Sequence, residues 1–521
     1  MRTDLFRKRA VTLLGAVLYA LFASLGCRAQ GHGHVDIPHA LLVALALLAP
    51  SYALLAWLLR RSGDAPPADT AAFRTGRAFL LILGCYVPML VIAYPGSFAY
   101  DVPFQLRQVF TGSYSTHHPL LHTLLLGLCV SLGRLLGSIN LGAALYTVLQ
   151  MTALSGCFAA ACASISRTCG ARAARRSAVF FALYPLHMFM AVNATKDVLF
   201  GGLLALTLAL SFEALCAPPG SMHPGLTAAL VLSGAGMMLL RNNALYAVAV
   251  WLPLLLVCRC GKRLLSCMLA AAVLCAGANG AMKAATGAQD GDLAEMLSLP
   301  IQQLARARCT AGDRLSDEEL AAIDRIMPGE SWQLYDPTIS DPVKFRFDTQ
   351  EFLRDARTYA GVYLSVGAKC PDVYIDALLA HTCAFWYPYS AYRVSGYYLQ
   401  MGVSTEQLDA WCDFDWITQV SPLRRVLESL SWRFGAQGAM QIPVIGYAFN
   451  TGVIIWVMFF FVLREMYAGR VRRVGVALLP VLLWGTFLLG PVMAGRYIYP
   501  FVCILPVLAS RPSGETYRRS V

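Results

Sequence analysis

Ionisable residues are rare in this chain, and a few of them interrupt apolar segments where they could do chemistry. One carboxylate, Asp101, stands in YPGSFAYDVPFQ, and three cations, Lys196, Arg241 and Arg496, stand in TKDVLF, LLRNNALYA and GRYIYPF. Arginine presents a planar fork to phosphate oxygens, and lysine a mobile point charge. A carboxylate near them can take a proton from an attacking hydroxyl, while fixed cations stabilise a leaving phosphate. Together the four residues suit an anionic lipid phosphate beside a general base.

Each of these residues also has an ordinary interpretation. Asp101 could be a solvated loop carboxylate. Lys196 and Asp197 could be a paired anchor at a helix end. Arg241 could extend to the membrane interface, and Arg496 alone would be a common anchor.

The histidine pair that follows is open in the same way. His117 could be a simple loop residue, and His118 could cap a helix that Pro119 opens. The joint pattern favours a site, because distant segments would deliver their charges to one side of the chain.

The composition shows what must position these residues. The chain has 521 residues, of which 57% are hydrophobic and 14% charged, with a mean hydropathy of +0.56. A soluble chain has roughly 25% charged residues, so the sequence predicts an all-α, multi-pass membrane protein. In such a protein the net charge of +12 reflects topology anchors rather than nucleic-acid binding.

Apolar runs long enough to cross a bilayer recur along the chain, and about twelve transmembrane helices are predicted. Their approximate limits are Ala10–Cys27, Ile37–Leu59, Arg77–Tyr94, Leu141–Ile165, Ser177–Val192, Val198–Leu215, Leu226–Leu240, Ala244–Cys258, Leu264–Met282, Pro443–Leu463, Val474–Val492 and Tyr497–Ala509. With both termini in the cytoplasm, the inner segments hold 22 basic residues, as the positive-inside rule expects.

Two segments test this scheme. Pro119–Gly137 is long enough to span, but a crossing would place the basic residues that follow outside. We therefore expect an outer re-entrant or juxtamembrane helix; His122 and Arg134 would make a full crossing costly. The first apolar segment also resembles a signal peptide, although a retained span is preferred.

The scheme divides the chain into three parts: a transmembrane module at 1–282 with a catalytic outer loop at 95–137, an extracytoplasmic and mainly helical domain at 283–441, and transmembrane helices at 442–521. In the outer domain, Ser316 and Glu319 have the spacing of a capping box. The aromatic stretch Phe385–Tyr398 suits a membrane interface.

Four cysteines fall in the predicted outer domain. They are Cys309, Cys370, Cys383 and Cys412. Two disulfides with three pairings are open, and so are free thiols.

Seven motifs in order resemble a bacterial family of multi-pass proteins, which in turn is similar to the GT-C glycosyltransferase superfamily. Besides the four motifs above they are HHPLLHTLLLG, LPIQQLAR and YDPTISDPVKF. The resemblance implies a bacterial cell-membrane enzyme that uses a polyprenyl-phosphate sugar on the outer face, with Asp101 as the catalytic acid or base. The acid is single here, with no adjacent second acid, so a divalent metal stays open and no cofactor is certain.

The resulting hypothesis is a GT-C-like glycosyltransferase that moves a sugar from polyprenyl phosphate to an extracytoplasmic cell-envelope glycan or lipid, with Asp101 as its base. The candidate donor- and substrate-binding residues are Gln105, His117, His118, Lys196, Asp197, Arg241, Asn242, Asn243, Arg496 and Tyr497. Two alternatives remain: a transporter or flippase of a lipid-linked or anionic substrate, and a polymerase or ligase of polyprenyl-diphosphate glycans.

Overall fold

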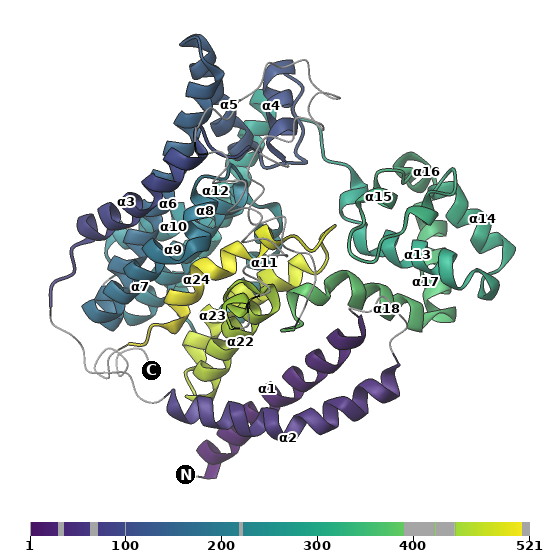
Figure 1. Cartoon of the computed structure of the whole chain (residues 1–521), viewed down its shortest axis with the longest axis horizontal. Helices are drawn as coiled ribbons and strands as arrows, with labels where there is room; N and C mark the ends of the chain where they lie inside the picture. Colours follow the sequence, from purple (N-terminus) through teal and green to yellow (C-terminus); the bar gives the residue numbers. More distant parts are fainter. Residues whose placement is uncertain are drawn as a thin grey trace.

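The computed structural model describes residues 2–29, 36–62, 71–98, 101–217, 222–389, 423, 442 and 444–512, and these residues form helices and isolated bridges without a strand (Figure 1). The α-helices are α1 (Arg2–Ala29), α2 (Ile37–Arg61), α3 (Thr75–Ala93), α4 (Asp101–Thr111), α5 (Leu120–Leu135), α6 (Ile139–Cys169), α7 (Ala171–Leu183), α8 (Pro185–Ala191), α9 (Lys196–Cys216), α10 (Pro224–Leu240), α11 (Asn242–Val257), α12 (Lys262–Thr286), α13 (Ser298–Thr310), α14 (Asp317–Ile326), α15 (Asp341–Lys344), α16 (Thr349–Arg354), α17 (Ala356–Lys369), α18 (Pro371–Thr382), α21 (Ile445–Phe449), α22 (Thr451–Tyr467), α23 (Val471–Phe487) and α24 (Tyr499–Ala509).

Six of the described helices are long and apolar enough to cross a membrane: α1, α2, α3, α6, α9 and α12. This confirms the prediction of an all-α chain with several helices of membrane-spanning length. Shorter apolar helices of 10–17 residues include α5, α10, α11 and the segment Gly495–Ala509.

One predicted span is divided in the structure. Ser177–Val192 is not a single helix but α7 and α8, which meet at Tyr184. Pro185 is the first residue of α8 and holds Tyr184 in an extended conformation, with φ −68° and ψ 119°. The cause is steric, because a proline ring disfavours helical backbone at the residue before it.

Two C-terminal spans also differ from their predicted limits. The span Pro443–Leu463 is interrupted at Asn450, whose side chain caps α22 by accepting a hydrogen bond from the Val453 N–H at 3.0 Å. Asparagine favours such caps over helix interiors. The span Val474–Val492 is too long by several residues, because α23 ends at Phe487.

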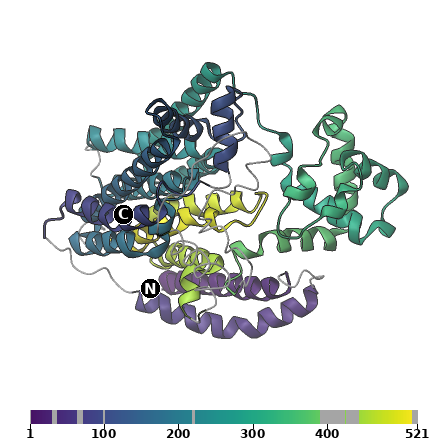
Figure 2. The ribbon, with the colours of Figure 1, turned by 45° about the horizontal axis from the view of Figure 1, so that its top comes forward.

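Helix α9 lies at the centre of the bundle and packs against α6, α10 and α24. Of its most apolar 18-residue window 72% is buried, against 6% for α2 at the periphery. Large apolar side chains such as Phe158, Phe200 and Trp251 fill the core around it. Helices α1 and α2 pack against each other along one side of the bundle (Figures 1 and 2). A charged side chain buried in this apolar core would therefore need a partner of opposite charge.

The helices α13 to α18 form a smaller unit beside the bundle, with its own apolar core that includes Ile301, Ile323 and Val366 (Figure 2). The predicted capping box is confirmed. The Glu319 N–H donates to Ser316 Oγ at 3.3 Å, and the Ser316 N–H donates to Glu319 Oε2 at 2.9 Å. We call this unit the small domain.

Two predictions fall partly outside the described residues. Of the aromatic stretch Phe385–Tyr398 only 385–389 is described. Among the four cysteines, Cys309, Cys370 and Cys383 are free thiols. Cys412 lies outside the described residues.

A close glycine contact holds α5 against α6 and so positions the loop that precedes α5. A Cβ added at Gly142 would lie 2.7 Å from Val130 Cα, and one added at Gly133 would overlap the backbone of Gly142. Small residues of this kind let two helix backbones approach closely.

We expect Gly142→Ala to lower the free energy of unfolding by about 1–3 kcal/mol, because the added methyl forces α5 away from α6. Thermal unfolding of the purified protein in detergent measures this. The matched control is Gly156→Ala in the same helix, where the space around the Cβ is open and a gain of up to about 1 kcal/mol is expected. Equal melting temperatures for the two variants would contradict the close contact.

Candidate functional site

A short backbone bridge brings Asp101 to Lys196. The Ser97 N–H donates to the Val192 carbonyl at 2.9 Å, and the Ala194 N–H donates to the Ser97 carbonyl at 2.8 Å. The segment after α3 is thereby tied to the segment before α9. Asp101 then starts α4 and Lys196 starts α9, so the two charged side chains leave from neighbouring helix ends.

Asp101 is held by two cations. Lys196 Nζ donates to Asp101 Oδ2 at 2.7 Å, and Arg496 Nη2 donates to Oδ1 at 3.2 Å. His118 Nδ1 lies 3.9 Å from Asp101 Oδ2 and 3.5 Å from Lys196 Nζ. Asp101 keeps 19% of its side-chain surface exposed and Lys196 13%, so the group is screened from solvent but not sealed. The structure therefore brings Asp101, Lys196 and Arg496 together, as the sequence predicted.

The charge state of this group follows from its neighbours. Burial raises the pKa of Asp101, but Arg496 and Lys196 outweigh it and hold that pKa well below its ordinary value. Burial lowers the pKa of His118 well below its ordinary value, despite the nearby Asp101 carboxylate. At neutral pH the carboxylate is therefore ionised and the imidazole neutral.

A second ion pair adjoins the first. Arg241 Nη1 lies 2.7 Å from Oδ1 of Asp197, whose side chain is fully buried. The geometry is that of an ion pair rather than of a directed hydrogen bond. The Arg241 guanidinium also lies over the rings of Phe487 at 4.3 Å and Tyr497 at 4.5 Å. Arg241 is thus buried among protein side chains and paired with Asp197.

Arg496 links the two pairs, since its Nε lies 3.9 Å from Asp197 Oδ2. The treatment of Asp101 as the single acid of the site was therefore wrong: Asp197 is a second acid within it. Asp197 was already among the candidate residues, but its closeness to Asp101 could not be derived, because the two lie 96 positions apart. We call Asp101, Lys196, Asp197, Arg241 and Arg496 the charge cluster.

The charge cluster holds three cations and two carboxylates, which leaves one positive charge when His118 is neutral. Lys196 and Asp197 lie in the first turn of α9, and Arg241 is the N-cap residue of α11. Helix N-termini carry partial positive charge from their unpaired N–H groups. The cluster therefore has an excess of positive potential, which suits an anionic ligand.

Other candidate residues lie at the edge of this cluster. His117 Nδ1 is 3.9 Å from Glu295 Oε1, and Asn242 Nδ2 donates to the Thr116 carbonyl at 3.5 Å. Tyr497 Oη accepts from Arg496 Nη2, also at 3.5 Å. Asn243 points elsewhere, donating to Thr486 Oγ1 at 2.8 Å.

Gln105 belongs to a separate buried network. Its Nε2 donates to Thr123 Oγ1 at 3.0 Å, and its Oε1 lies 3.0 Å from His122 Nδ1. His122 Nε2 in turn lies 2.7 Å from Tyr146 Oη, and Tyr146 donates to Gln150. Both ends of the Gln105 amide are therefore occupied, and Gln105 fixes α4 against α5 in this conformation. Its proposed contact with a sugar or acceptor stays a prediction.

The small domain is fastened to the segment that carries Arg496. The Ser340 N–H donates to the Pro491 carbonyl at 2.8 Å, and His381 Nε2 lies 2.8 Å from the Gly490 carbonyl. Within the small domain, Gln302 donates to the Asp336 carbonyl at 2.7 Å. The motifs LPIQQLAR and YDPTISDPVKF thus lie in the small domain, and the second contacts the backbone of the segment before Arg496.

Within the residues that the structure describes, no three or more His, Cys, Asp or Glu side chains are grouped to hold a metal ion. The two carboxylates of the charge cluster are both engaged by cations. The residues present therefore bind each other rather than forming a ready site for a divalent cation.

Comparison with known proteins places the chain in a family. Residues 110–518, more than three quarters of the chain, match a family of unknown function, DUF6020. The chain belongs to DUF6020. No curated protein and no solved structure matches it. The DUF6020 match includes Lys196, Asp197, Arg241 and Arg496, whereas Asp101 precedes it.

We expect Arg241→Met to lower the free energy of unfolding by about 3–5 kcal/mol. The variant leaves the buried Asp197 carboxylate with the more distant Arg496, at 3.9 Å. A double-mutant cycle with Asp197→Asn should show a coupling of about 1–3 kcal/mol. Thermal or denaturant unfolding in detergent measures both.

The control for this cycle is the exposed pair of Lys283 and Asp290, whose side chains are 42% and 82% exposed. The cycle of Lys283→Met and Asp290→Asn should give no more than about 1 kcal/mol. Additive effects at Arg241 and Asp197 would show that their ion pair does not hold the site together.

Proposed function

We propose that this chain is a GT-C-type membrane glycosyltransferase that moves a sugar from a polyprenyl-phosphate donor to an extracytoplasmic glycan or lipid acceptor. The observation that supports it is the charge cluster, in which Asp101 lies between Lys196 and Arg496 at the starts of several helices. Lys196 and Arg496 would bind the donor phosphate, and Asp101 would act as the base. Arg241 would mainly hold Asp197 and the adjoining helices in place.

The proposed enzyme spans the membrane about twelve times, with both termini in the cytoplasm of a bacterial cell and the small domain outside. The short helices α10, α11, α22 and α23 have 16 or 17 residues, a rise of about 24–26 Å. That is slightly less than the roughly 30 Å hydrocarbon core. These helices would cross with their ends covered by neighbouring helices, and α4 and α5 would lie at the outer surface.

The ion pairs around Asp101 support a mechanism in which the donor itself activates the base. A carboxylate held by two cations has a low pKa and is a weak base. A donor phosphate that recruits Lys196 and Arg496 competes with Asp101 for them and raises its pKa. Asp101 then takes the proton of the acceptor hydroxyl. The acceptor oxygen bonds to the sugar C1, the bond from C1 to the phosphate oxygen breaks, and its electron pair stays on the phosphate.

One observation favours a second candidate, a polymerase or ligase of polyprenyl-diphosphate glycans. Asp101 is doubly paired and its pKa is lowered, which would also suit a counter-ion that only orders Lys196 and Arg496. In that case the cations would be essential and the carboxylate would not act as a base.

We expect Asp101→Asn to reduce the transfer rate by at least about 10²-fold, because it removes the base but keeps the size of the side chain. Transfer from a panel of polyprenyl-phosphate sugars in membranes measures the rate. Arg496→Gln should weaken use of the donor by about ten- to a hundred-fold, and His117→Ala should cost less than Asp101→Asn.

Asp290→Asn is the matched control, since Asp290 is 82% exposed and should leave the rate unchanged. A near-wild-type rate for Asp101→Asn, together with a loss for Arg496→Gln, would favour the second candidate.

The proposed topology predicts that Cys309 and position 172 lie on opposite sides of the membrane. Cys309 is exposed in the small domain, so a membrane-impermeant maleimide should label it in intact cells. An Arg172→Cys variant in a background in which Cys27, Cys309 and Cys412 are replaced by serine should be labelled only after the membrane is permeabilised. Labelling of both positions in intact cells would show that the assignment of sides is wrong.

A further inference from the structure

Four polar side chains of α4, α5 and α6 form one connected network inside the bundle. They are Gln105, His122, Tyr146 and Gln150, and each is 0% exposed. His122 Nδ1 lies 3.0 Å from Gln105 Oε1, its Nε2 lies 2.7 Å from Tyr146 Oη, and Tyr146 Oη donates to Gln150 Oε1 at 3.1 Å. A satisfied polar network of this kind fixes one arrangement of the helices that carry it. We call these four residues the buried network.

One side of the buried network adjoins two groups of the site. Gln105 follows Asp101 by one turn of α4, and His122 follows His118 by four residues. His118 itself lies 3.9 Å from Asp101. The contact between Gln105 and His122 therefore joins the chain just after Asp101 to the chain just after His118.

The other side of the buried network, Gln150, holds the segment before α9. Its Nε2 donates to the carbonyls of Ala191 at 3.0 Å and Asn193 at 2.9 Å. The carbonyl between them, that of Val192, accepts from the Ser97 N–H at 2.9 Å. Three successive carbonyls are thus occupied, so this segment cannot shift along α6 without losing hydrogen bonds.

Thr147, three residues before Gln150 on α6, holds the segment that leads to Asp101. Its Oγ1 donates to the Pro95 carbonyl at 2.8 Å, and a Cβ added at Gly96 would overlap this hydroxyl. Helix α6 therefore binds both segments from which the charged side chains of α4 and α9 begin, and it does so with uncharged groups.

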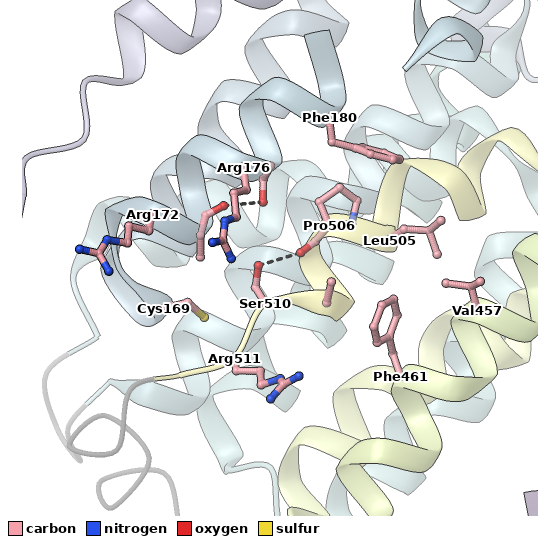
Figure 3. A pocket seen from close by; sticks show the side chains of 13 residues that line it. Cys169, Arg172, Arg176, Phe180, Val457, Phe461, Leu505, Pro506, Ser510 and Arg511 are labelled. Carbon is pink, nitrogen blue, oxygen red and sulfur yellow. Dashed lines mark hydrogen bonds between the residues drawn. The ribbon is translucent and has the colours of Figure 1, made fainter. Parts of the chain in front are cut away.

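The far end of α6 has different surroundings. There Cys169 lines a pocket of about 630 Å³ together with Phe180, Phe461 and Leu505 (Figure 3). Cys169 lies 19 positions after Gln150, a rise of about 28 Å along the helix. The buried network is therefore distinct from this pocket and lies at the end of α6 that adjoins the charge cluster.

We propose that Gln150 is a positioning residue, which sets the distance between Asp101 and Lys196 through its hold on the segment before α9. The inference rests on the proposed transfer reaction, in which the donor phosphate reaches Lys196 while Asp101 stays at the acceptor. Gln150 is fully buried and acts only through the backbone. Without its two hydrogen bonds to that backbone, the start of α9 separates from the start of α4, and the transfer slows.

The first test does not need the reaction. In the full-length protein in detergent, Gln150→Met removes both hydrogen bonds and keeps the length of the side chain. Amide hydrogen exchange, followed by mass spectrometry, should become at least about ten-fold faster in peptides that cover residues 95–98 and 191–197. The reason is that the backbone bridge between these segments opens more often.

Ser155→Ala is the matched control for this exchange experiment. It also removes a buried polar group from α6, but Ser155 Oγ makes no hydrogen bond within the part of the chain that the structure describes. The control should keep the wild-type exchange. Equal exchange in Gln150→Met and the wild type, or the same increase in Gln150→Met and Ser155→Ala, would overturn the proposal.

The second test is the pH dependence of kcat/KM for transfer. Arg496 and Lys196 hold the pKa of Asp101 well below its ordinary value, and His118 lies beside them. When Lys196 moves away, that pKa rises, and a base acts only above its pKa. The acid limb of Gln150→Met should therefore move to higher pH. A loss of folded protein alone would lower the rate at every pH, so an unmoved limb would refute the positioning role.

Tyr146→Phe is a milder variant for the case in which Gln150→Met does not fold. It removes one hydroxyl from the buried network and leaves Gln150 in place, so exchange at 191–197 should rise by a smaller factor. Wild-type exchange in Tyr146→Phe would contradict a connected network. Faster exchange without any transfer by the wild type would refute the proposed reaction alone, whereas unchanged exchange with normal wild-type transfer would refute the role of Gln150 alone.

Discussion

The structure depends on one constraint: charges buried where the helices of an apolar bundle begin must be paired. The full burial of Asp197 would be very costly without Arg241 at 2.7 Å. Asp101 is likewise held by Lys196 and Arg496. These residues lie at the starts of α4 and α9 and just before α11 and α24, so pairing the charges aligns the ends of four helices. The requirement to neutralise buried charge therefore both organises the bundle and assembles the site.

Backbone contacts set the remaining geometry. The bridge between Ser97 and the segment before α9 places the start of α4, and the contact of Gly133 with Gly142 places α5. Because neither contact uses a charged side chain, the position of Asp101 does not rely on its own ion pairs alone. A ligand that draws the cations away would leave the carboxylate in place.

The helices were largely predictable because an apolar run of about 20 residues has few other stable forms. The breaks at Tyr184 and Asn450 depend on single residues within apolar runs, and the predicted spans passed over them. The candidate residues Asp101, Lys196 and Arg496 could be chosen as rare charges in apolar surroundings. Their pairing could not be derived, because Arg496 reaches Asp101 across 395 positions. The contact of Gln105 with a ligand stays a prediction, whereas its hydrogen bonds with Thr123 and His122 could not be foreseen, because they depend on how α4 packs against α5.

The attachment of the small domain to Gly490 and Pro491 through His381 and Ser340 has a consequence for how this architecture can diversify. Four residues separate Pro491 from Arg496, a reach of at most about 18 Å. A displacement of the small domain would therefore also displace the segment that carries Arg496. An exchange of the small domain for another would have to preserve these two attachments, or the guanidinium of Arg496 would lose its placement along with them.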